Sequence, residues 1–137
     1  MGLKSGIEMV QAFHGKFGLP QGSHDQLMDS EEAIKFRIAF LKEELNELNQ
    51  ALEDGDNVKA FDALLDLAYV TYGTALFMGI TPIMWQRGFE AVQQANMSKV
   101  RAQSESDSRR GTTLDVVKPE GWVGPEEELA EILVCRQ

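Results

Sequence analysis

The 137-residue sequence is poor in cysteine and in basic residues. Its single cysteine, Cys135, cannot form an internal disulfide and has no partner at a spacing that binds zinc. Lysine and arginine number 13 against 22 acidic residues, so the formal net charge is −9. Proteins that bind polymeric nucleic acid use basic residues to displace counterions from phosphates. The charge balance therefore argues against such a partner.

Long hydrophobic runs are also absent from the sequence. No stretch approaches the roughly 20 apolar residues that span a bilayer, and the opening MGLKSGIEMVQAF does not resemble a signal peptide. We therefore expect a cytoplasmic protein with no membrane partner. Hydrophobic residues make up 43% of the chain, which is enough to bury a core without disulfides, and the length favours one domain.

Hydrophobic periodicity predicts an all-α fold with a four-helix bundle at its core. The expected helices are residues 4–17, a helix from Asp29 or Ser30 to a break at Gly55, residues 57–78, and a helix that begins with Thr81 and Pro82. Because helices of this kind bury one face each, the four together would form the core.

The last third of the chain is predicted to be less regular. Residues 103–113 are polar and are expected to form a loop or a mobile arm, LDVVK an extended piece, and the residues after Pro125 a short helix. We expect residues 1–102 to form a helical bundle catalytic domain. Residues 103–137 would then pack on it as a polar loop and C-terminal extension.

The second helix has a narrow apolar seam that we expect to pack on a partner helix. Its residues recur every three or four positions: Ile34, Ile38, Leu41, Leu45, Leu48 and Leu52. A flanking stripe contains Ala33, Phe36, Phe40 and Ala51. Glu44 and Glu47 fall inside this stripe, whereas Glu43 lies further round, so acidic residues interrupt an apolar face.

The third helix is apolar nearly all round but contains Asp62 and Asp66, which are four residues apart and share one face. Burying several unpaired carboxylates is costly, and matching cations are scarce. Oxygen ligands suit a hard divalent ion, Mg²⁺ or Mn²⁺. Neither His14 nor His24 follows a glutamate at the spacing of a di-iron site, which disfavours iron.

An ordered set of motifs carries a family resemblance. The motifs are EExxE at 43–47, DxxxD at 62–66 followed by YVTYG, NMSK at 96–99 and KPEGW at 118–122. From Phe36 to Trp122 the chain resembles the all-α NTP pyrophosphatase superfamily. That superfamily includes MazG-like enzymes, dimeric dUTPases and phosphoribosyl-ATP pyrophosphohydrolases.

The resemblance implies hydrolysis of a nucleoside triphosphate between its α and β phosphates, with Mg²⁺ as cofactor. It implies Glu44, Glu47 and Asp66 as metal ligands, Asp62 as a further ligand, and Glu43 as another ligand or the base that orients water. Glu43, Glu44 and Glu47 form the predicted catalytic group. Many relatives carry a glutamate three residues before the aspartate that corresponds to Asp66, and this chain has Ala63 there.

Four residues are predicted to bind the substrate: Asn96, Lys99, Lys118 and Tyr69. Asn96 and Lys99 match an NxxK pattern that the resemblance implies in sugar or phosphate contacts, and Lys118 could share that role. The ring of Tyr69 could stack on a base. The resemblance also implies a homodimer or a dimer of dimers.

Three functions remain open at the level of sequence. The first is NTP pyrophosphohydrolysis in nucleotide-pool housecleaning, possibly with dUTPase-like specificity. The second is hydrolysis of phosphoribosyl-ATP. The third is a non-catalytic helical module whose acidic face binds a basic partner.

Overall fold

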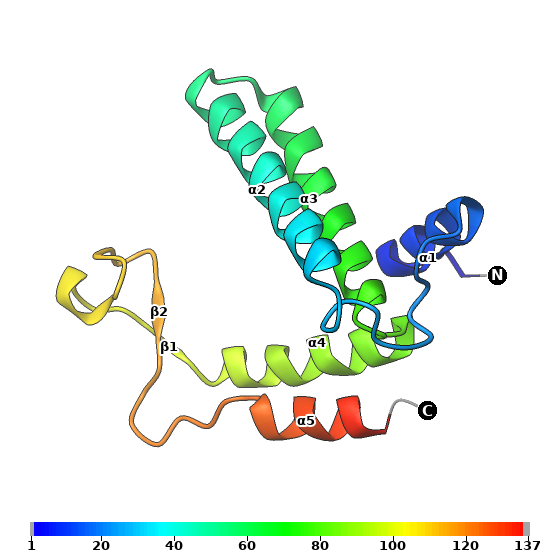
Figure 1. Ribbon diagram of the computed structural model, residues 1–137. Coiled ribbons are helices and arrows are strands. Elements are labelled where there is room, and N and C mark those ends of the chain that lie inside the picture. Colours follow the sequence, from blue (N-terminus) through cyan, green and yellow to red (C-terminus); the bar gives the residue numbers. More distant parts are fainter. Residues whose placement is uncertain (1, 136–137) are drawn as a thin grey trace. The chain divides into compact units, whose positions relative to one another are not determined.

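The computed structural model describes residues 2–135 and confirms the predicted all-α helical fold (Figure 1). Its helices are α1 (Gly6–Phe17), α2 (Glu31–Glu53), α3 (Asn57–Phe77), α4 (Pro82–Met97) and α5 (Glu126–Val134). The chain forms two compact units, Met1–Trp85 and Gln86–Gln137, which are described separately. The boundary at residue 102 stays a prediction.

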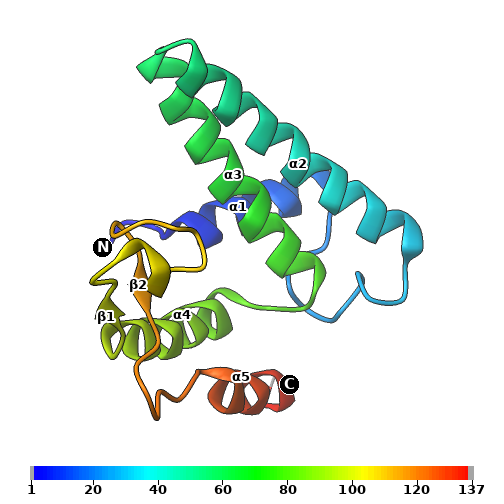
Figure 2. The ribbon, with the colours of Figure 1, turned by 90° about the vertical axis from the view of Figure 1, so that its left-hand side faces the viewer.

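The starts of α2 and α3 follow from capping residues. The Ser30 side chain accepts a hydrogen bond from the Ala33 backbone N–H, and the Asp56 side chain accepts one from Lys59. Between the two helices, Gly55 has a φ of 69°, a left-handed conformation that glycine adopts without strain. The chain therefore reverses within a few residues, and α2 and α3 lie side by side as a hairpin (Figures 1 and 2).

The contact between α2 and α3 has a seven-residue spacing. The buried residues of α2 are Arg37, Glu44 and Ala51, and those of α3 include Ala63, Val70 and Phe77. A repeat near 3.5 residues per turn keeps two helices in contact along their length. Glu44 lies in the middle of this buried column, which agrees with the prediction that acids interrupt an apolar face.

The narrow seam of the second helix is not the surface that α3 covers. Ile38, Leu45 and Leu52 are 47%, 55% and 62% exposed. The other three seam residues, Ile34, Leu41 and Leu48, are only half-buried. The prediction that the seam packs on a partner helix is therefore not met by α3, which packs on the column of Arg37 and Glu44 instead.

The hydrophobic core of the first unit lies between α1 and α3. Ile7 and Val10 of α1 pack with Ala75 and Leu76 of α3. Around this cluster the Tyr72 and Trp85 rings meet edge to face, with centroids 5.4 Å apart. α1 therefore covers the C-terminal half of α3.

Arg37 joins α2 to α3 inside the first unit. The side chain is 5% exposed, and its Nε and Nη2 donate to the Thr74 hydroxyl at 3.0 Å and the Val70 carbonyl at 2.8 Å. Its guanidinium carbon lies 4.8 Å from the centre of the Phe77 ring. Within residues 2–135 no carboxylate pairs with it. Burial lowers its pKa, but a guanidinium stays charged at neutral pH.

Gly73 lets Arg37 and His14 lie against the α3 backbone. A Cβ at this position would be 2.7 Å from Arg37 Nη2 and 3.0 Å from His14 Nε2, and the two hydrogen bonds of Arg37 hold it there. We expect Gly73→Ala to lower the free energy of unfolding by about 1–3 kcal/mol, as overpacking of buried positions does. Urea denaturation measures this change.

Gly88→Ala in α4 is the matched control for Gly73→Ala. A Cβ at Gly88 would meet Leu129 at 3.4 Å, an ordinary contact distance, and alanine favours a helix. This variant should be neutral or slightly more stable than the wild type. Equal stability of the two variants would contradict the close packing around Gly73.

The second unit contains a short antiparallel strand pair and α5. β1 (Val100–Arg101) pairs with β2 (Val116–Val117), which confirms an extended segment within LDVVK. The polar arm between the strands includes a one-turn 3₁₀-helix, Glu105–Asp107. The predicted helix after Pro125 is also confirmed, and α5 runs beside α4 (Figures 1 and 2).

Among the described residues no single helix is both long enough and apolar enough to cross a membrane. α3 and α4 pass that test of length and composition only together, as a bent pair.

Candidate metal centre

Three of the predicted metal ligands come together in the α2–α3 hairpin. Glu44, Glu47 and Asp66 each offer one carboxylate oxygen, and these three oxygens lie within 4.8 Å of one another. Glu44 is 8% exposed, Asp66 is half-buried and Glu47 is exposed. The group is therefore closed on the side of Glu44 and accessible on the side of Glu47.

One oxygen of Glu44 has no hydrogen-bond donor. Among the described residues, Glu44 Oε2 is the buried side-chain polar atom that lacks any partner. Burial raises the pKa of Glu44 to about 7, and repulsion from Glu47 and Asp66 adds to the shift. Leaving a buried acceptor unsatisfied costs about 1–3 kcal/mol. Hard divalent cations prefer carboxylate oxygens as ligands, so the residues present fit Mg²⁺ or Mn²⁺.

Two other predicted site residues lie outside this group. Glu43 and Asp62 are both exposed, and neither contributes an oxygen to the three-carboxylate cluster. Ala63, at the position where many relatives carry glutamate, is 3% exposed and is a buried residue of α3. The roles of Glu43 and Asp62 stay predictions.

The predicted substrate residues lie in different units. Tyr69 follows Asp66 by one helical turn, is 41% exposed, and meets the Phe13 ring edge to face at 5.4 Å. Asn96 is exposed near the end of α4, whereas Lys99 is half-buried and Lys118 exposed. Their roles in substrate binding stay predictions.

A polar hollow of about 420 Å³ lies in the second unit, and sequence analysis did not predict it. It is lined by four cations, two carboxylates and two valines: Lys99, Arg109, Arg110, Lys118, Asp107, Asp115, Val116 and Val117. To find the hollow from the sequence, one would have to recognise that Val100 pairs with Val117. Strands of two residues are too short to be detected from periodicity.

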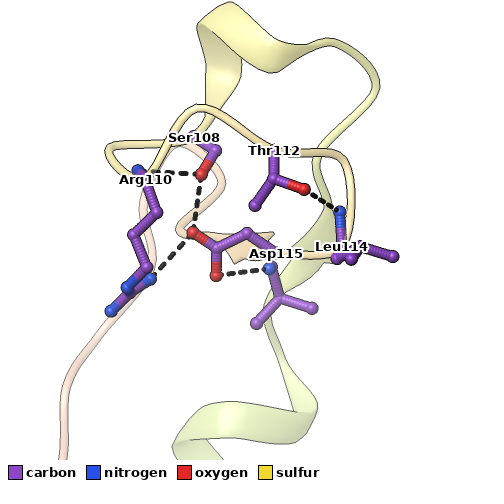
Figure 3. A network of polar contacts seen from close by, with 6 residues as sticks. Ser108, Arg110, Thr112, Leu114 and Asp115 are labelled. Carbon is purple, nitrogen blue, oxygen red and sulfur yellow. Dashed lines mark hydrogen bonds and ion pairs between the residues drawn. The ribbon is translucent and has the colours of Figure 1, made fainter. Parts of the chain in front are cut away.

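Asp115 lines this hollow and lies at the centre of a network of polar contacts (Figure 3). Its Oδ2 accepts hydrogen bonds from the Ser108 hydroxyl at 2.7 Å and from Arg110 Nη1 at 2.8 Å, and its Oδ1 accepts one from the Val116 N–H. The Ser108 hydrogen bond, followed by the Arg110 contact, lowers the pKa of Asp115. Arg110 is thus paired within the wall.

The raised pKa of Glu44 predicts how metal-free stability depends on pH. The folded-state pKa of Glu44, about 7, exceeds its ordinary value of 4.5. The protonated side chain therefore contributes fully to stability below pH 4.5, and this contribution is lost as the pH rises through about 7. We expect metal-free Glu44→Gln to melt at a higher temperature than the wild type at about pH 8, because an amide carries no buried charge. The two proteins should melt together at about pH 4.5.

Thermal melts in EDTA, compared between the two proteins at each pH, measure this difference. The paired comparison is needed because His14 acts in the opposite direction. Burial lowers the pKa of His14, so its contribution to stability is full above pH 6.5 and is lost as the pH falls through its lowered pKa. Identical melting of wild type and Glu44→Gln at alkaline pH would contradict a buried charge at Glu44.

The hairpin and its three carboxylates define an all-α protein with a candidate divalent-metal centre. The chain belongs to the phosphoribosyl-ATP pyrophosphohydrolase family, PRA-PH, because the sequence model of that family matches residues 10–96. This match confirms the predicted superfamily and includes all three carboxylates of the cluster.

The chain is also similar to "Uncharacterized protein L479" of Acanthamoeba polyphaga mimivirus. The two are 30% identical over 76 residues, which cover 53% of this chain and 30% of the viral protein. The chain thus spans less than a third of the length of that relative, whose name assigns no activity.

Proposed function

We propose that this chain is a Mg²⁺-dependent nucleoside triphosphate pyrophosphohydrolase that releases a nucleoside monophosphate and pyrophosphate. The observation that carries the proposal is the buried, unpartnered Glu44 oxygen beside Glu47 and Asp66. Membership of a pyrophosphohydrolase family supports the reaction class. A role in nucleotide-pool housecleaning, with dUTPase-like specificity as one form, follows from this class.

In this proposal the carboxylates of α2 and α3 hold the cation. Glu44, Glu47 and Asp66 would each supply an oxygen, and the bound Mg²⁺ (or Mn²⁺) would supply a Lewis acid for phosphoryl oxygens. Glu43, on the same turn of α2, would orient a water and take its proton as that oxygen bonds to the α-phosphorus. The bond from the α-phosphorus to the bridging oxygen breaks, and pyrophosphate leaves with its electron pair.

Tyr69, Asn96, Lys99 and Lys118 are proposed to bind the nucleotide. The exposed ring of Tyr69 lies one turn from Asp66 on α3 and offers a face for a base. Ammonium groups such as those of Lys99 and Lys118 suit phosphate oxygens. Asp62 remains a proposed further ligand on α3.

A panel of NTPs and dNTPs, each incubated with Mg²⁺, tests the proposed function. Pyrophosphate release without orthophosphate is the expected result. Orthophosphate alone would overturn cleavage between the α and β phosphates. No turnover of any nucleotide, with or without Mn²⁺, would favour the non-catalytic module that binds a basic partner.

Phosphoribosyl-ATP is the second candidate substrate, because the family that matches residues 10–96 takes its name from that hydrolysis. The chemistry is the same, since this compound also carries a triphosphate. Including it in the panel separates the two candidates: turnover of phosphoribosyl-ATP alone would replace the general NTP activity.

A homodimer, or a dimer of such dimers, is proposed as the working assembly. The first unit exposes large apolar side chains on α2 and α3, among them Leu45, Leu52, Phe61, Leu64 and Leu65 at 52–64% exposure. A monomeric protein rarely exposes so many large apolar side chains on one helical hairpin, and a second copy of the chain would bury them.

Sedimentation analysis tests this assembly. We expect the wild type to sediment as a dimer or tetramer and Leu45→Glu to shift toward the monomer, because an interfacial charge would be buried without a partner. Glu53→Gln, a polar change at the end of α2, is the control and should not alter assembly. A monomeric wild type at all concentrations would contradict the proposal.

A further inference from the structure

In the second unit, Trp122 brings together two motifs that are distant in the sequence. Its indole Nε1 donates to the Ala95 carbonyl at 2.8 Å, near the C-terminal end of α4. The same carbonyl also accepts a hydrogen bond from the Ser98 hydroxyl at 2.7 Å, so the ring is fixed to the segment that continues into Lys99. The KPEGW motif is thereby tied to the NMSK motif.

A tight turn places Trp122 close to Lys118. The Trp122 N–H donates to the Pro119 carbonyl at 3.1 Å, and Gly121 has a φ of 79°. A positive φ at the third residue is the mark of a type II turn, and glycine adopts it without strain. The turn folds the indole back toward the lysine that precedes it.

Two ammonium groups lie on this one indole ring. Lys99 Nζ is 5.2 Å and Lys118 Nζ is 4.9 Å from the ring centre. Each ammonium group gains cation–π attraction from the same indole. Within residues 2–135 no carboxylate forms an ion pair with either lysine.

The carboxylates of the adjoining hollow are already engaged by other donors. Asp115 accepts from Ser108 and Arg110, and Asp107 Oδ2 accepts from the backbone N–H groups of Gln103 and Ser104. Lys99, Lys118 and Arg109 are the lining cations without an ion pair in the described part of the chain. In a chain with a net charge of −9, a concave surface with three unpaired cations is selective for an anion.

We propose that Trp122 is a positioning residue that holds Lys99 and Lys118 as a paired clamp for the terminal phosphates of the nucleotide, with Arg109 as the third cation. This inference rests on the proposed function, and it adds Arg109 to the substrate contacts and Trp122 as the residue that positions two of them. Two cations that line one hollow offer a partner to each of the two neighbouring charges of a pyrophosphate group, whereas a single phosphate needs fewer partners.

Calorimetric titration with inorganic tripolyphosphate in EDTA tests the clamp without the metal centre. We expect Lys99→Gln and Lys118→Gln each to weaken binding about tenfold, the usual effect of losing a charged hydrogen bond. Trp122→Leu should weaken it by about the same factor. Trp122→Phe, which keeps an aromatic face, should bind within about threefold of the wild type.

Lys16→Gln is the matched control, because Lys16 also lies over an aromatic ring, Phe17 at 5.4 Å, but outside the hollow. It should leave tripolyphosphate binding unchanged. Trp122→Phe binding as weakly as Trp122→Leu would overturn the positioning role, as would orthophosphate binding as tightly as tripolyphosphate. If Trp122→Leu does not fold, the Lys99→Gln and Lys118→Gln variants still decide whether a clamp exists.

Nucleotide kinetics separate failure of the clamp from failure of the proposed function. Trp122→Leu should raise KM about tenfold with kcat within about twofold, because the clamp would bind the substrate and the transition state equally well. Nucleotide cleavage with an unchanged KM in this variant would overturn the clamp and leave the proposed function standing. Tripolyphosphate binding that depends on Trp122, together with no cleavage of any nucleotide, would support the clamp and overturn the function.

Discussion

Asp66→Asn is expected to abolish pyrophosphate release, with kcat reduced by a factor on the order of 10³ or more. Asp66 supplies the α3 oxygen of a cluster whose other two members are on α2. An amide keeps the shape of the side chain but removes the negative charge, so a divalent cation would lose the α3 member of the three-carboxylate cluster. Glu47→Gln should have a comparable effect, because it removes the solvent-accessible member.

Two measurements make the result specific. Steady-state assays with Mg²⁺ report the loss of turnover, and Mn²⁺ titration by electron paramagnetic resonance reports the loss of metal binding independently of substrate. Glu53→Gln, the same chemical change near the end of α2 and outside the cluster, should retain full activity. Full metal binding by Asp66→Asn would show that the three carboxylates do not form the metal site.

The helices and the acidic cluster could be predicted because they depend on local signals. Ser30 and Asp56 are typical caps, and Gly55 is a typical break, so the boundaries of α2 and α3 follow from residues next to them. Glu44 was predicted on a largely apolar stripe, and the helical period alone places it one turn from Glu47. Charge on an apolar face is unfavourable, which is why this pattern indicated a ligand.

The face of α2 that meets α3 could not be predicted from the same period. The leucine seam and the column of Arg37, Glu44 and Ala51 both repeat every seven residues, and hydrophobicity favours the seam. The hairpin instead buries the column because Arg37 forms hydrogen bonds with two groups on α3. These contacts join residues more than 30 positions apart, so the pattern of α2 alone does not indicate them. Three of the six seam residues, Ile38, Leu45 and Leu52, remain exposed.

The contacts of Trp122 were equally inaccessible from the sequence. Its partner Ala95 is 27 residues away, and the strands that connect the two segments are only two residues each. Sequence analysis singled out Lys99 and Lys118 by motif, but only the fold shows that they share one ring. Local patterns therefore single out candidate residues more readily than they show which residues meet.

Arg37→Ala is expected to lower the free energy of unfolding by about 2–4 kcal/mol, a large effect for one residue. Arg37 is 5% exposed and forms hydrogen bonds with Thr74 and Val70, while its guanidinium stacks on Phe77. Truncation removes these contacts and leaves a cavity between α2 and α3. Denaturant unfolding in EDTA measures the loss without a contribution from bound metal.

Two further replacements separate the shape of Arg37 from its charge. Arg37→Met keeps much of the volume and removes an unpaired buried charge, so it should cost less than Arg37→Ala. Arg37→Lys keeps the charge, but a single ammonium cannot reproduce both hydrogen bonds, so it should be less stable than Arg37→Met. An Arg37→Lys variant as stable as the wild type would contradict the role of the two bonds. Glu44 lies two turns further along the same buried column, so the contacts of Arg37 also fix the register in which Glu44 faces α3.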